Sequence, residues 1–352
     1  MLQGINKSFW KGKKVFITGH TGFKGSWLSI WLNNLGADIK GYSLKPVKPN
    51  SLFEIANVAN FLESDFNNIK DLDILKRSIL EFKPEILIHM AAQPLVLASY
   101  ANPIETYEVN VIGTANILEA SRECSSIKAI LNITTDKCYE NFEKTTGYEE
   151  GDPMGGHDPY SSSKGCAELV TTAYRKSFYE NLDIGLASVR AGNVIGGGDW
   201  ADNRLIPDIL KSFQENKTVT IRNPKAIRPW QHVLEPLAGY IELTEKLYNS
   251  PSKYSSGWNF GPNDEDVKSV EWILSYMSNL WPDSKWKVDE ENKLHEAQLL
   301  KLNISKATNN LSWQPKWSIE ITLQRIIEWH KLWLTGYDMH QACLDEIKEY
   351  TK

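Results

Sequence analysis

Short apolar runs alternate with longer amphipathic segments through the first half of the chain. The short runs have the length and composition of buried strands and span Lys14–Thr18, Ile39–Ser43, Phe61–Ser64, Ile86–Met90, Ala129–Thr134 and Gly185–Val189. Between them, apolar residues recur at helical spacing over Trp27–Leu35, Leu72–Phe82, Ile104–Arg122 and Ser161–Phe178. Strands and helices that alternate in this way form a parallel sheet with helices on both faces. The pattern therefore predicts an α/β fold with a doubly wound parallel sheet.

The pattern becomes irregular after Arg190. Helical spacing returns over Leu205–Phe213, Val270–Leu280 and Ile319–Leu334, and Thr218–Arg222 has the composition of a strand. Turn-rich segments separate these elements. We therefore expect residues 1–189, joined by about 229–262, to form the sheet domain. Residues 190–352 are expected to form mainly a smaller C-terminal substrate-binding lobe.

A glycine-rich loop joins the first strand to the first long helix. Gly19, Gly22 and Gly25 follow the apolar run that ends at Thr18. Glycines allow a tight turn and a close approach of the backbone to a ligand, and the following helix N-terminus favours an anionic pyrophosphate. The spacing is GxxGxxG rather than GxGxxG, so an ordinary strand-to-helix turn remains the alternative. The loop predicts a Rossmann-like dinucleotide-binding domain.

Two further segments carry groups suited to acid–base chemistry. Tyr160 and Lys164 stand four residues apart, which places a phenol and an ammonium on one helical face. A nearby cation favours phenolate and lowers the pKa of a tyrosine, which can then act as a general base. The run from Thr134 to Tyr139 follows the end of a strand, where ligands bind in open α/β sheets. Its Thr and Asp residues are also typical of simple turns and helix caps.

These motifs together resemble the extended short-chain dehydrogenase/reductase family over nearly the whole chain. The resemblance is carried by Thr18–Gly25, His89–Gln93, Asn110 before Val111-Ile112-Gly113-Thr114, Tyr160 with Lys164, Arg190–Asp199 and Arg228–Val233. Within the family, the runs Gly19–Trp27, Thr135–Tyr139 and Gly198–Asp202 are most similar to dehydratases that act on CDP-sugars. Most 4,6-dehydratases of the family have Thr-Asp-Glu where this chain has Thr135-Asp136-Lys137. The resemblance implies a hydro-lyase that removes water from CDP-glucose.

The resemblance also implies roles for individual residues. It implies NAD as cofactor, held by Gly19, Thr21, Gly22, Phe23, Lys24, Gly25, Asp65, Phe66, Ala91, Ala92, Gln93, Asn110, Tyr160 and Lys164. The implied catalytic residues are Thr135, Asp136, Lys137, Tyr160 and Lys164, and the implied substrate-binding residues are Asn193, Arg204 and Arg228. Lys137 is either the base at C5 of the sugar or an electrostatic stabiliser of the enolate, because an ordinary lysine is protonated near neutral pH.

The cofactor's identity is less clear from the residues themselves. NAD enzymes usually place Asp or Glu at the end of the second strand, where that side chain binds the ribose 2′-hydroxyl. Here the run Gly41-Tyr42-Ser43-Leu44-Lys45 offers no acid, and Lys45 would even suit a 2′-phosphate. NAD therefore rests on the family resemblance.

Composition narrows the classes of partner. With 352 residues and a net charge of −5, the chain gives no reason to expect nucleic acid or an anionic membrane as a partner. It has no apolar run long enough to span a bilayer, and its first residues lack a signal-peptide pattern. The irregularly spaced cysteines, Cys124, Cys138, Cys166 and Cys343, match no metal or redox motif. These features predict a cytoplasmic enzyme without a metal, and the family resemblance implies a homodimer or higher homo-oligomer through Ile104–Arg122 and Ser161–Phe178.

Two other functions share part of this pattern. A nucleotide-sugar 4-epimerase has the same loop and Tyr/Lys pair but needs no acid–base groups for dehydration, which the Thr135-Asp136-Lys137 run supplies. A non-catalytic NAD(P)-binding sensor can lose the Tyr/Lys pair, which is intact here. Another nucleotide-sugar 4,6-dehydratase is the nearest alternative.

Overall fold

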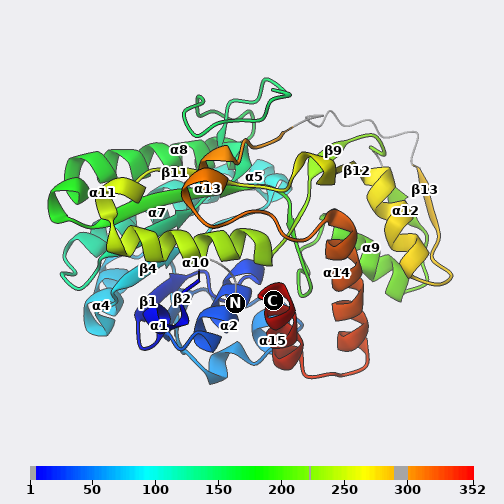
Figure 1. The fold of residues 1–352 in the computed structure, drawn as a ribbon, viewed down its shortest axis with the longest axis horizontal. Helices are drawn as coiled ribbons and strands as arrows, with labels where there is room; N and C mark the ends of the chain where they lie inside the picture. Colours follow the sequence, from blue (N-terminus) through cyan, green and yellow to red (C-terminus); the bar gives the residue numbers. More distant parts are fainter. Residues whose placement is uncertain (1–4, 222, 289–299) are drawn as a thin grey trace.

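A seven-stranded parallel sheet forms the centre of the molecule (Figure 1). The computed structural model describes residues 5–221, 223–288 and 300–352. The strands are β1 (Lys14–Thr18), β2 (Asp38–Ser43), β3 (Glu63–Phe66), β4 (Ile86–His89), β5 (Ala129–Ile133), β6 (Gly185–Ala191) and β11 (Gly257–Phe260). Their order is β11-β6-β5-β4-β1-β2-β3, and every pairing is parallel. The predicted α/β fold is confirmed, and the order reverses beside β1, where the glycine-rich loop begins.

Alternating residues of the central strands face two separate cores. Val15 and Ile17 of β1 lie in one apolar cluster, whereas Phe16 between them lies in another on the opposite face. Successive strand residues point to opposite faces, so a strand that is covered on both sides is apolar throughout. This explains why the buried strands appear in the sequence as continuous apolar runs.

Helices cover both faces of the sheet. One face packs against α2 (Phe23–Asn34), α10 (Leu234–Asn249) and α15 (Met339–Tyr350), and the other against α4 (Leu72–Phe82), α7 (Gly113–Arg122) and η4 (Arg175–Tyr179). The predicted helix at Ile104–Arg122 consists of α6 (Pro103–Tyr107), the π-helical turn η2 (Glu108–Ile112) and α7. Helix α2 begins four residues earlier than the sequence pattern indicates, because Gly22 is its N-cap.

A smaller group of elements lies beside the sheet, on the right in Figure 1. It contains α9 (Leu205–Gln214), α12 (Val270–Leu280), α14 (Ile319–Leu334) and the parallel pair β8 (Val219–Ile221) and β13 (Trp286–Val288), around a third apolar cluster. Of the predicted strand Thr218–Arg222, the last residue lies outside the described residues. The boundary at residue 189 stays a prediction, since α10, β11 and α15 also pack on or within the sheet.

The remaining elements complete the chain. The helical ones are α1 (Lys7–Trp10), α3 (Leu52–Ile55), η1 (Val58–Asn60), α5 (Val96–Ala101), η3 (Asp136–Cys138), α8 (Pro159–Tyr174), η5 (Glu180–Leu182), α11 (Pro251–Tyr254), η6 (Asp264–Asp266) and α13 (Ser305–Asn310). Two short pairs join β7 (Val194–Ile195) to β10 (Gln231–His232) and β9 (Ile227–Pro229) to β12 (Val267–Ser269). Among the described residues, no helix is long and apolar enough to cross a bilayer.

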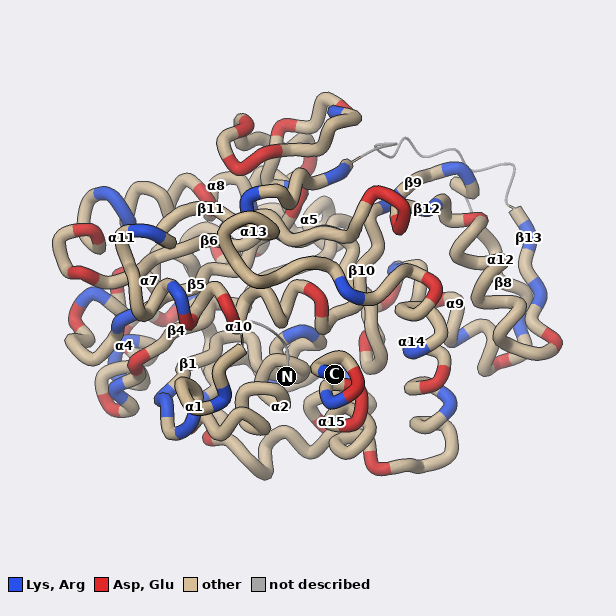
Figure 2. The backbone as a smooth tube through the Cα atoms, in the orientation of Figure 1, with Lys and Arg blue, Asp and Glu red and all other residues tan. Residues whose placement is uncertain are grey.

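Lys and Arg positions are interspersed with Asp and Glu positions along the chain (Figure 2). Mixed surface charge is typical of a protein that does not bind a polyanion through one broad basic face.

Three histidines are buried in the uncharged form, and they make stability sensitive to acid. Burial lowers the pKa of His20 and of His330 to about 4 and that of His89 to about 3. An unfolded histidine binds its proton near pH 6.5, so below that pH the unfolded state takes up more protons. We expect the free energy of unfolding to fall by ~1.4 kcal/mol per histidine for each pH unit below about 6.5, down to about pH 4.

Urea unfolding measured between about pH 7 and pH 5 checks this expectation above the range in which most carboxylates titrate. The variant His330→Phe removes one of the three groups and should flatten the slope. Equal unfolding free energies across this interval would contradict the assignment of these histidines as neutral.

Candidate active site

The glycine-rich loop leaves a cradle without side chains between β1 and α2. Gly19 has φ +77°, and a Cβ there would lie 2.7 Å from the Ala91 nitrogen. A Cβ on Gly25 would lie 2.1 Å from the Gly19 carbonyl oxygen. Gly22 caps α2 with no side-chain hydrogen bond, so the first N–H groups of the helix are not taken by a capping side chain. This geometry fits the pyrophosphate of a dinucleotide at a helix N-terminus.

The loop is tied to the end of the second strand. The Thr21 hydroxyl donates to the Leu44 carbonyl at 3.0 Å and accepts from the Ser43 hydroxyl at 2.9 Å. Phe23 lies beside Gly196, where an added Cβ would come within 3.1 Å of its ring. Thr21 and Phe23 thus shape the loop through contacts within the chain.

The Thr135-Asp136-Lys137 segment directly follows β5. The Thr135 hydroxyl donates to Asp136 Oδ1 at 2.8 Å, and Lys137 Nζ lies 3.4 Å from the same oxygen. Thr135 also caps the 3₁₀ turn η3 by accepting from the Lys137 N–H. The run therefore also forms the capped turn that its Thr and Asp residues are typical of. This turn brings the three side chains together. Asp136 is 1% exposed.

Helix α8 carries the predicted Tyr/Lys pair into the same region. The Asp158 carboxylate caps the helix by accepting from the Ser161 N–H, and Pro159 occupies its first turn. Tyr160 is therefore in the first turn and Lys164 one turn later, both buried. Lys164 Nζ donates to the Ile133 carbonyl at 3.3 Å, and the Thr135 hydroxyl is a hydrogen-bonding partner of Tyr160. The structure thus brings the predicted catalytic residues from β5 and α8 together.

The expected lowering of the tyrosine pKa is not found. Burial raises the pKa of Tyr160 to about 12, and the Asp136 charge acts in the same direction, whereas Thr135 and Arg204 oppose it. Burial also lowers the pKa of Lys164 to about 8, against the opposing charge of Glu168. The sequence-based expectation was wrong because desolvation of the phenol outweighs the nearby cations.

Lys24 belongs to the same electrostatic cluster. Burial lowers the pKa of this lysine to about 7, and the positive charges of Lys164 and Arg204 lower it further, against Asp136. Its ammonium therefore lies within electrostatic reach of the catalytic groups. The glycine-rich loop thus extends from the cofactor cradle to the reaction centre.

Gly192 makes room for the Asp136 carboxylate. A Cβ on Gly192 would lie 2.0 Å from Asp136 Oδ2, so even alanine would displace the acid. We expect Gly192→Ala to lower kcat by about 10²-fold, because a displacement of about 1 Å at a reacting group costs that much. Steady-state rates and thermal melting check this expectation. In the control Gly151→Ala, where an added Cβ meets nothing within 4 Å, the rate should be unchanged.

The residues predicted to contact adenine lie at the end of β3. Asp65 accepts hydrogen bonds from Asn67 and, at 2.7 Å, from Ser78, and Lys40 Nζ lies 3.9 Å away. Phe66 stacks on the His20 ring, with centroids 6.2 Å apart. The Asp65 carboxylate is thus engaged within the chain, and its contact with adenine stays a prediction.

Asn110 connects the segment after β4 to α8. Its side chain accepts from the Gln93 N–H at 2.8 Å and donates to the Gln93 carbonyl and to the Ser163 hydroxyl. Ala91 donates its N–H to the Thr18 hydroxyl at 3.2 Å, and Ala92 is the next residue along the chain. These bonds hold residues 91–93 beside the glycine-rich loop, and they commit the Asn110 amide to positioning them.

The predicted substrate-binding residues are spread over two elements and a loop. Arg204 caps α9 and donates to Asp199 Oδ2 at 3.0 Å, and its charge reaches Tyr160 and Lys24. Asn193 follows β6 with φ +41°, and its carbonyl accepts from the Gln231 N–H. Arg228 lies on β9 and donates to the Ile227 carbonyl. Arg204 thus joins the catalytic cluster, whereas the roles of Asn193 and Arg228 stay predictions.

Two buried charged residues behind the site have no role in the sequence-based prediction. Glu168 and Arg190 form an ion pair at 2.8 Å and are 2% and 4% exposed. Glu168 lies four residues after Lys164, so this helical spacing was the signal in the sequence that could have placed Glu168 beside the site.

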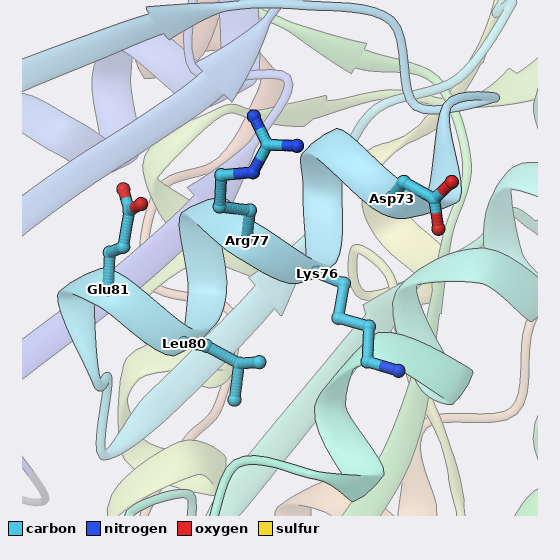
Figure 3. Close-up of a pocket in the computed structure, with 5 residues that line it drawn as sticks. All are labelled: Asp73, Lys76, Arg77, Leu80 and Glu81. Carbon is cyan, nitrogen blue, oxygen red and sulfur yellow. The ribbon is translucent and has the colours of Figure 1, made fainter.

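A surface hollow of the structure is lined only by Asp73, Lys76, Arg77, Leu80 and Glu81 of α4 (Figure 3). It contains none of the predicted site residues and carries no functional argument.

Comparison with known proteins shows the family of this chain. The family model described as GDP-mannose 4,6 dehydratase matches residues 16–326. The chain belongs to this family. It is 57% identical to a CDP-glucose 4,6-dehydratase of Salmonella typhimurium, and the match covers 98% of each chain.

Solved structures of other proteins share the fold of this chain. A dTDP-glucose 4,6-dehydratase of Bacillus anthracis, solved in complex with NAD, matches with a TM-score of 0.75 and 21% identity, over 94% of this chain and 100% of the other. A UDP-glucose 4-epimerase of Thermotoga maritima, with UDP-glucose, matches with a TM-score of 0.76 and 19% identity, over 91% and 99%. Because a dehydratase and an epimerase fit equally well, the fold alone does not select the reaction.

Proposed function

We propose that the chain is a lyase that converts CDP-glucose to CDP-4-keto-6-deoxyglucose and water with NAD as cofactor. The observation that carries this proposal is the Thr135-Asp136-Lys137 turn, which lies against Tyr160 and Lys164 at the end of β5. An epimerase has no use for a second acid–base set at this place. The 57% identity to a CDP-glucose 4,6-dehydratase over 98% of the chain supports the same reaction and substrate.

The glycine cradle, the α2 N-terminus and Lys164 would hold the cofactor. When bound, NAD would accept a hydride from C4 of the sugar and later return one to C6. The N–H groups at the start of α2 would bind the pyrophosphate, and the Lys164 ammonium would bind the nicotinamide ribose. Asp65 and Phe66, at the end of β3, would face the adenosine.

In the first step, Tyr160 removes the proton of the sugar 4-hydroxyl. Thr135 hydrogen-bonds the reacting hydroxyl and holds it near the phenol. Tyr160 must ionise to act, and the positive charge of Arg204 lowers its pKa against the effect of burial. The 4-ketone formed in this step makes the proton at C5 acidic.

In the second step, Asp136 protonates the departing 6-hydroxyl, and water leaves. Asp136 receives the Thr135 hydroxyl on the oxygen that also faces Lys137. Lys137 either takes the proton from C5, or stabilises the enolate by its charge while another group or water takes that proton. The group that takes the proton returns one to C5 when C6 receives its hydride. Asn193, Arg204 and Arg228 hold the nucleotide diphosphate, for which a guanidinium provides bidentate geometry.

A panel of nucleotide sugars tests the proposed substrate. The protein, supplied with NAD, is incubated with CDP-, dTDP-, UDP- and GDP-glucose, and products are identified by mass. We expect loss of water from CDP-glucose at a kcat/KM far above that for the other three. If another nucleotide sugar is dehydrated faster, that sugar replaces CDP-glucose as the proposed substrate. If the sugar is interconverted without loss of water, epimerisation replaces dehydration as the proposed reaction.

We further propose a homodimer that forms through α5, α6, η2 and α8. These neighbouring elements expose large apolar side chains, namely Leu97, Tyr100, Ile104, Ile112 and Leu169, all more than half exposed. Large apolar patches on one face of a protein are typical of interaction surfaces, and a two-fold axis pairs the same patch with itself.

Paired charges on this patch should dissociate the dimer. We expect Ile104→Glu/Leu169→Glu to sediment as a monomer at concentrations at which the unmodified protein sediments as a dimer. Like charges placed in a self-complementary apolar interface are desolvated and repel each other. The control Leu334→Glu alters an exposed leucine on α14, outside the patch, and should leave sedimentation unchanged. An unmodified protein that sediments as a monomer would contradict the proposal.

A further inference from the structure

A buried ion pair connects the two elements that carry the catalytic residues. Glu168, on α8, accepts from Arg190 Nε at 3.0 Å and from Arg190 Nη2 at 2.8 Å. It also accepts from the Ser188 hydroxyl at 2.7 Å. Arg190 lies on β6, which pairs with β5. The pair therefore fixes α8 to the sheet directly behind the site.

The same pair holds both ends of the catalytic turn. Before the turn, the Thr134 hydroxyl donates to Glu168 Oε1 at 2.5 Å. After it, Arg190 Nη1 donates to the Tyr139 hydroxyl at 2.5 Å, and the guanidinium lies 5.0 Å from the centre of the Tyr139 ring. Tyr139 donates in turn to Asn259 on β11. Only four residues, Thr135 to Cys138, lie between these two anchors, so the turn is held to the ion pair at both ends.

Glu168 also acts electrostatically on Lys164, one turn before it on α8. Burial lowers the pKa of Lys164, and the charge of Glu168 opposes that effect. Burial raises the pKa of Cys138 and lowers that of His89, so both neighbours are uncharged near neutral pH. On the side of α2, the charge of Lys164 lowers the pKa of Lys24. Glu168 is thus the anionic group that keeps Lys164 protonated.

Glu168 itself is ionised. Burial alone would raise the pKa of this carboxyl, but the charge of Arg190 and the hydrogen bonds from Arg190, Thr134 and Ser188 hold it below its ordinary value. The buried guanidinium of Arg175 is the other cation on which the charge of Glu168 acts. The carboxylate therefore presents a permanent negative charge to Lys164 across the working pH range.

We propose that Glu168 and Arg190 are positioning residues that set the Thr135-Asp136-Lys137 turn against Tyr160 and Lys164. The inference rests on the proposed dehydratase activity. It adds to that site two residues that do not themselves react. Neither side chain is placed to touch the sugar. They act through Thr134, Tyr139 and Lys164.

Three variants test this role. Glu168→Gln should lower kcat by about 10²-fold with KM nearly unchanged, because the turn shifts relative to Tyr160. It should also move the basic limb of the pH–rate profile to lower pH, because Lys164 loses its anionic neighbour. Arg190→Lys keeps the charge opposite Glu168, so kcat should fall while the basic limb stays in place. Glu168→Leu/Arg190→Met removes both buried charges and is expected to fold, since apolar replacement of a buried ion pair is often neutral for stability.

The matched control is Glu85→Gln, which breaks a hydrogen-bonded ion pair with Lys13 at the opposite end of the sheet. It should change thermal stability without changing kcat or the pH profile. A folded Glu168→Gln or double variant with unmodified kcat and pH profile would overturn the proposal, as would losses that merely follow the melting temperature.

A readout without substrate separates this inference from the proposed function. The protonation of Lys164 is followed by NMR of the protein labelled at its lysine side chains, with Lys164→Met used to assign the signal. Glu168→Gln should lower the pH at which Lys164 loses its proton, because the buried ammonium loses its anionic neighbour. An unmoved titration in a folded variant would overturn the electrostatic role. A protein inactive on CDP-glucose that still shows the shift would instead refute only the substrate.

Discussion

Tyr160→Phe is expected to lower kcat by about 10³-fold while the affinity for NAD stays within a few fold. The phenol is the group that removes the proton of the sugar 4-hydroxyl, and general-base catalysis contributes between about 10² and 10⁴. Phenylalanine keeps the buried ring in place, and the Lys164 ammonium stays bound to the Ile133 carbonyl. Initial rates and a fluorescence titration with NAD check both parts.

The control for this variant is Tyr276→Phe, which removes a hydroxyl from α12 in the smaller region of the structure. Its kcat should equal that of the unmodified protein. Turnover by Tyr160→Phe at the unmodified rate would contradict the assigned base and, with it, the oxidation at C4.

Asp136→Asn is expected to lower the rate of water loss by at least about 10²-fold, because an amide cannot protonate the leaving 6-hydroxyl. Oxidation at C4 does not require this proton. The variant should therefore still oxidise the 4-hydroxyl, and the absorbance of reduced nicotinamide should rise when CDP-glucose is added. Mass spectrometry of the products and absorbance measured together separate the two steps.

An exposed carboxylate provides the comparison. Asp264→Asn removes an acid that pairs with Lys301 at the surface, and it should leave both rates unchanged. Water loss from Asp136→Asn at the unmodified rate would show that another group is the acid. Loss of both oxidation and water release would show that Asp136 acts before the elimination.

The sequence predicts β1, β2, β4, β5 and β6 closely, because each is a short run that ends at a turn. It places β3 two residues too early, at Phe61–Ser64, and it does not predict β11, whose Gly-Trp-Asn-Phe sequence is not a continuous apolar run. It does not reveal α10, whose first two turns are buried on all sides and contain Pro236 and Gly239. A helix that is buried all round has no polar face and therefore no clear period. Gly239 is required there because a Cβ would lie 2.1 Å from Phe260 of β11, a contact that exists only in the folded chain.

The candidate active site, too, can be predicted from the sequence only in part. Tyr160, Lys164 and the Thr135-Asp136-Lys137 run are visible in the sequence, because their spacing and their place after strands indicate one sheet edge. The direction of the Tyr160 pKa shift is not visible there, since it depends on how much of the phenol is buried. The Glu168–Arg190 pair is formed between residues 22 positions apart on two elements, so only the folded arrangement reveals it.

The most direct test of the central claim is the fate of a deuterium at C4 of CDP-glucose. The protein is incubated with NAD and the labelled sugar, and the product is examined by mass spectrometry and NMR. The account predicts that one molecule of water is lost and that the deuterium is recovered at C6, because the hydride removed from C4 returns within the same active site. An unchanged mass with formation of CDP-galactose, or water loss with the deuterium retained at C4, would contradict it.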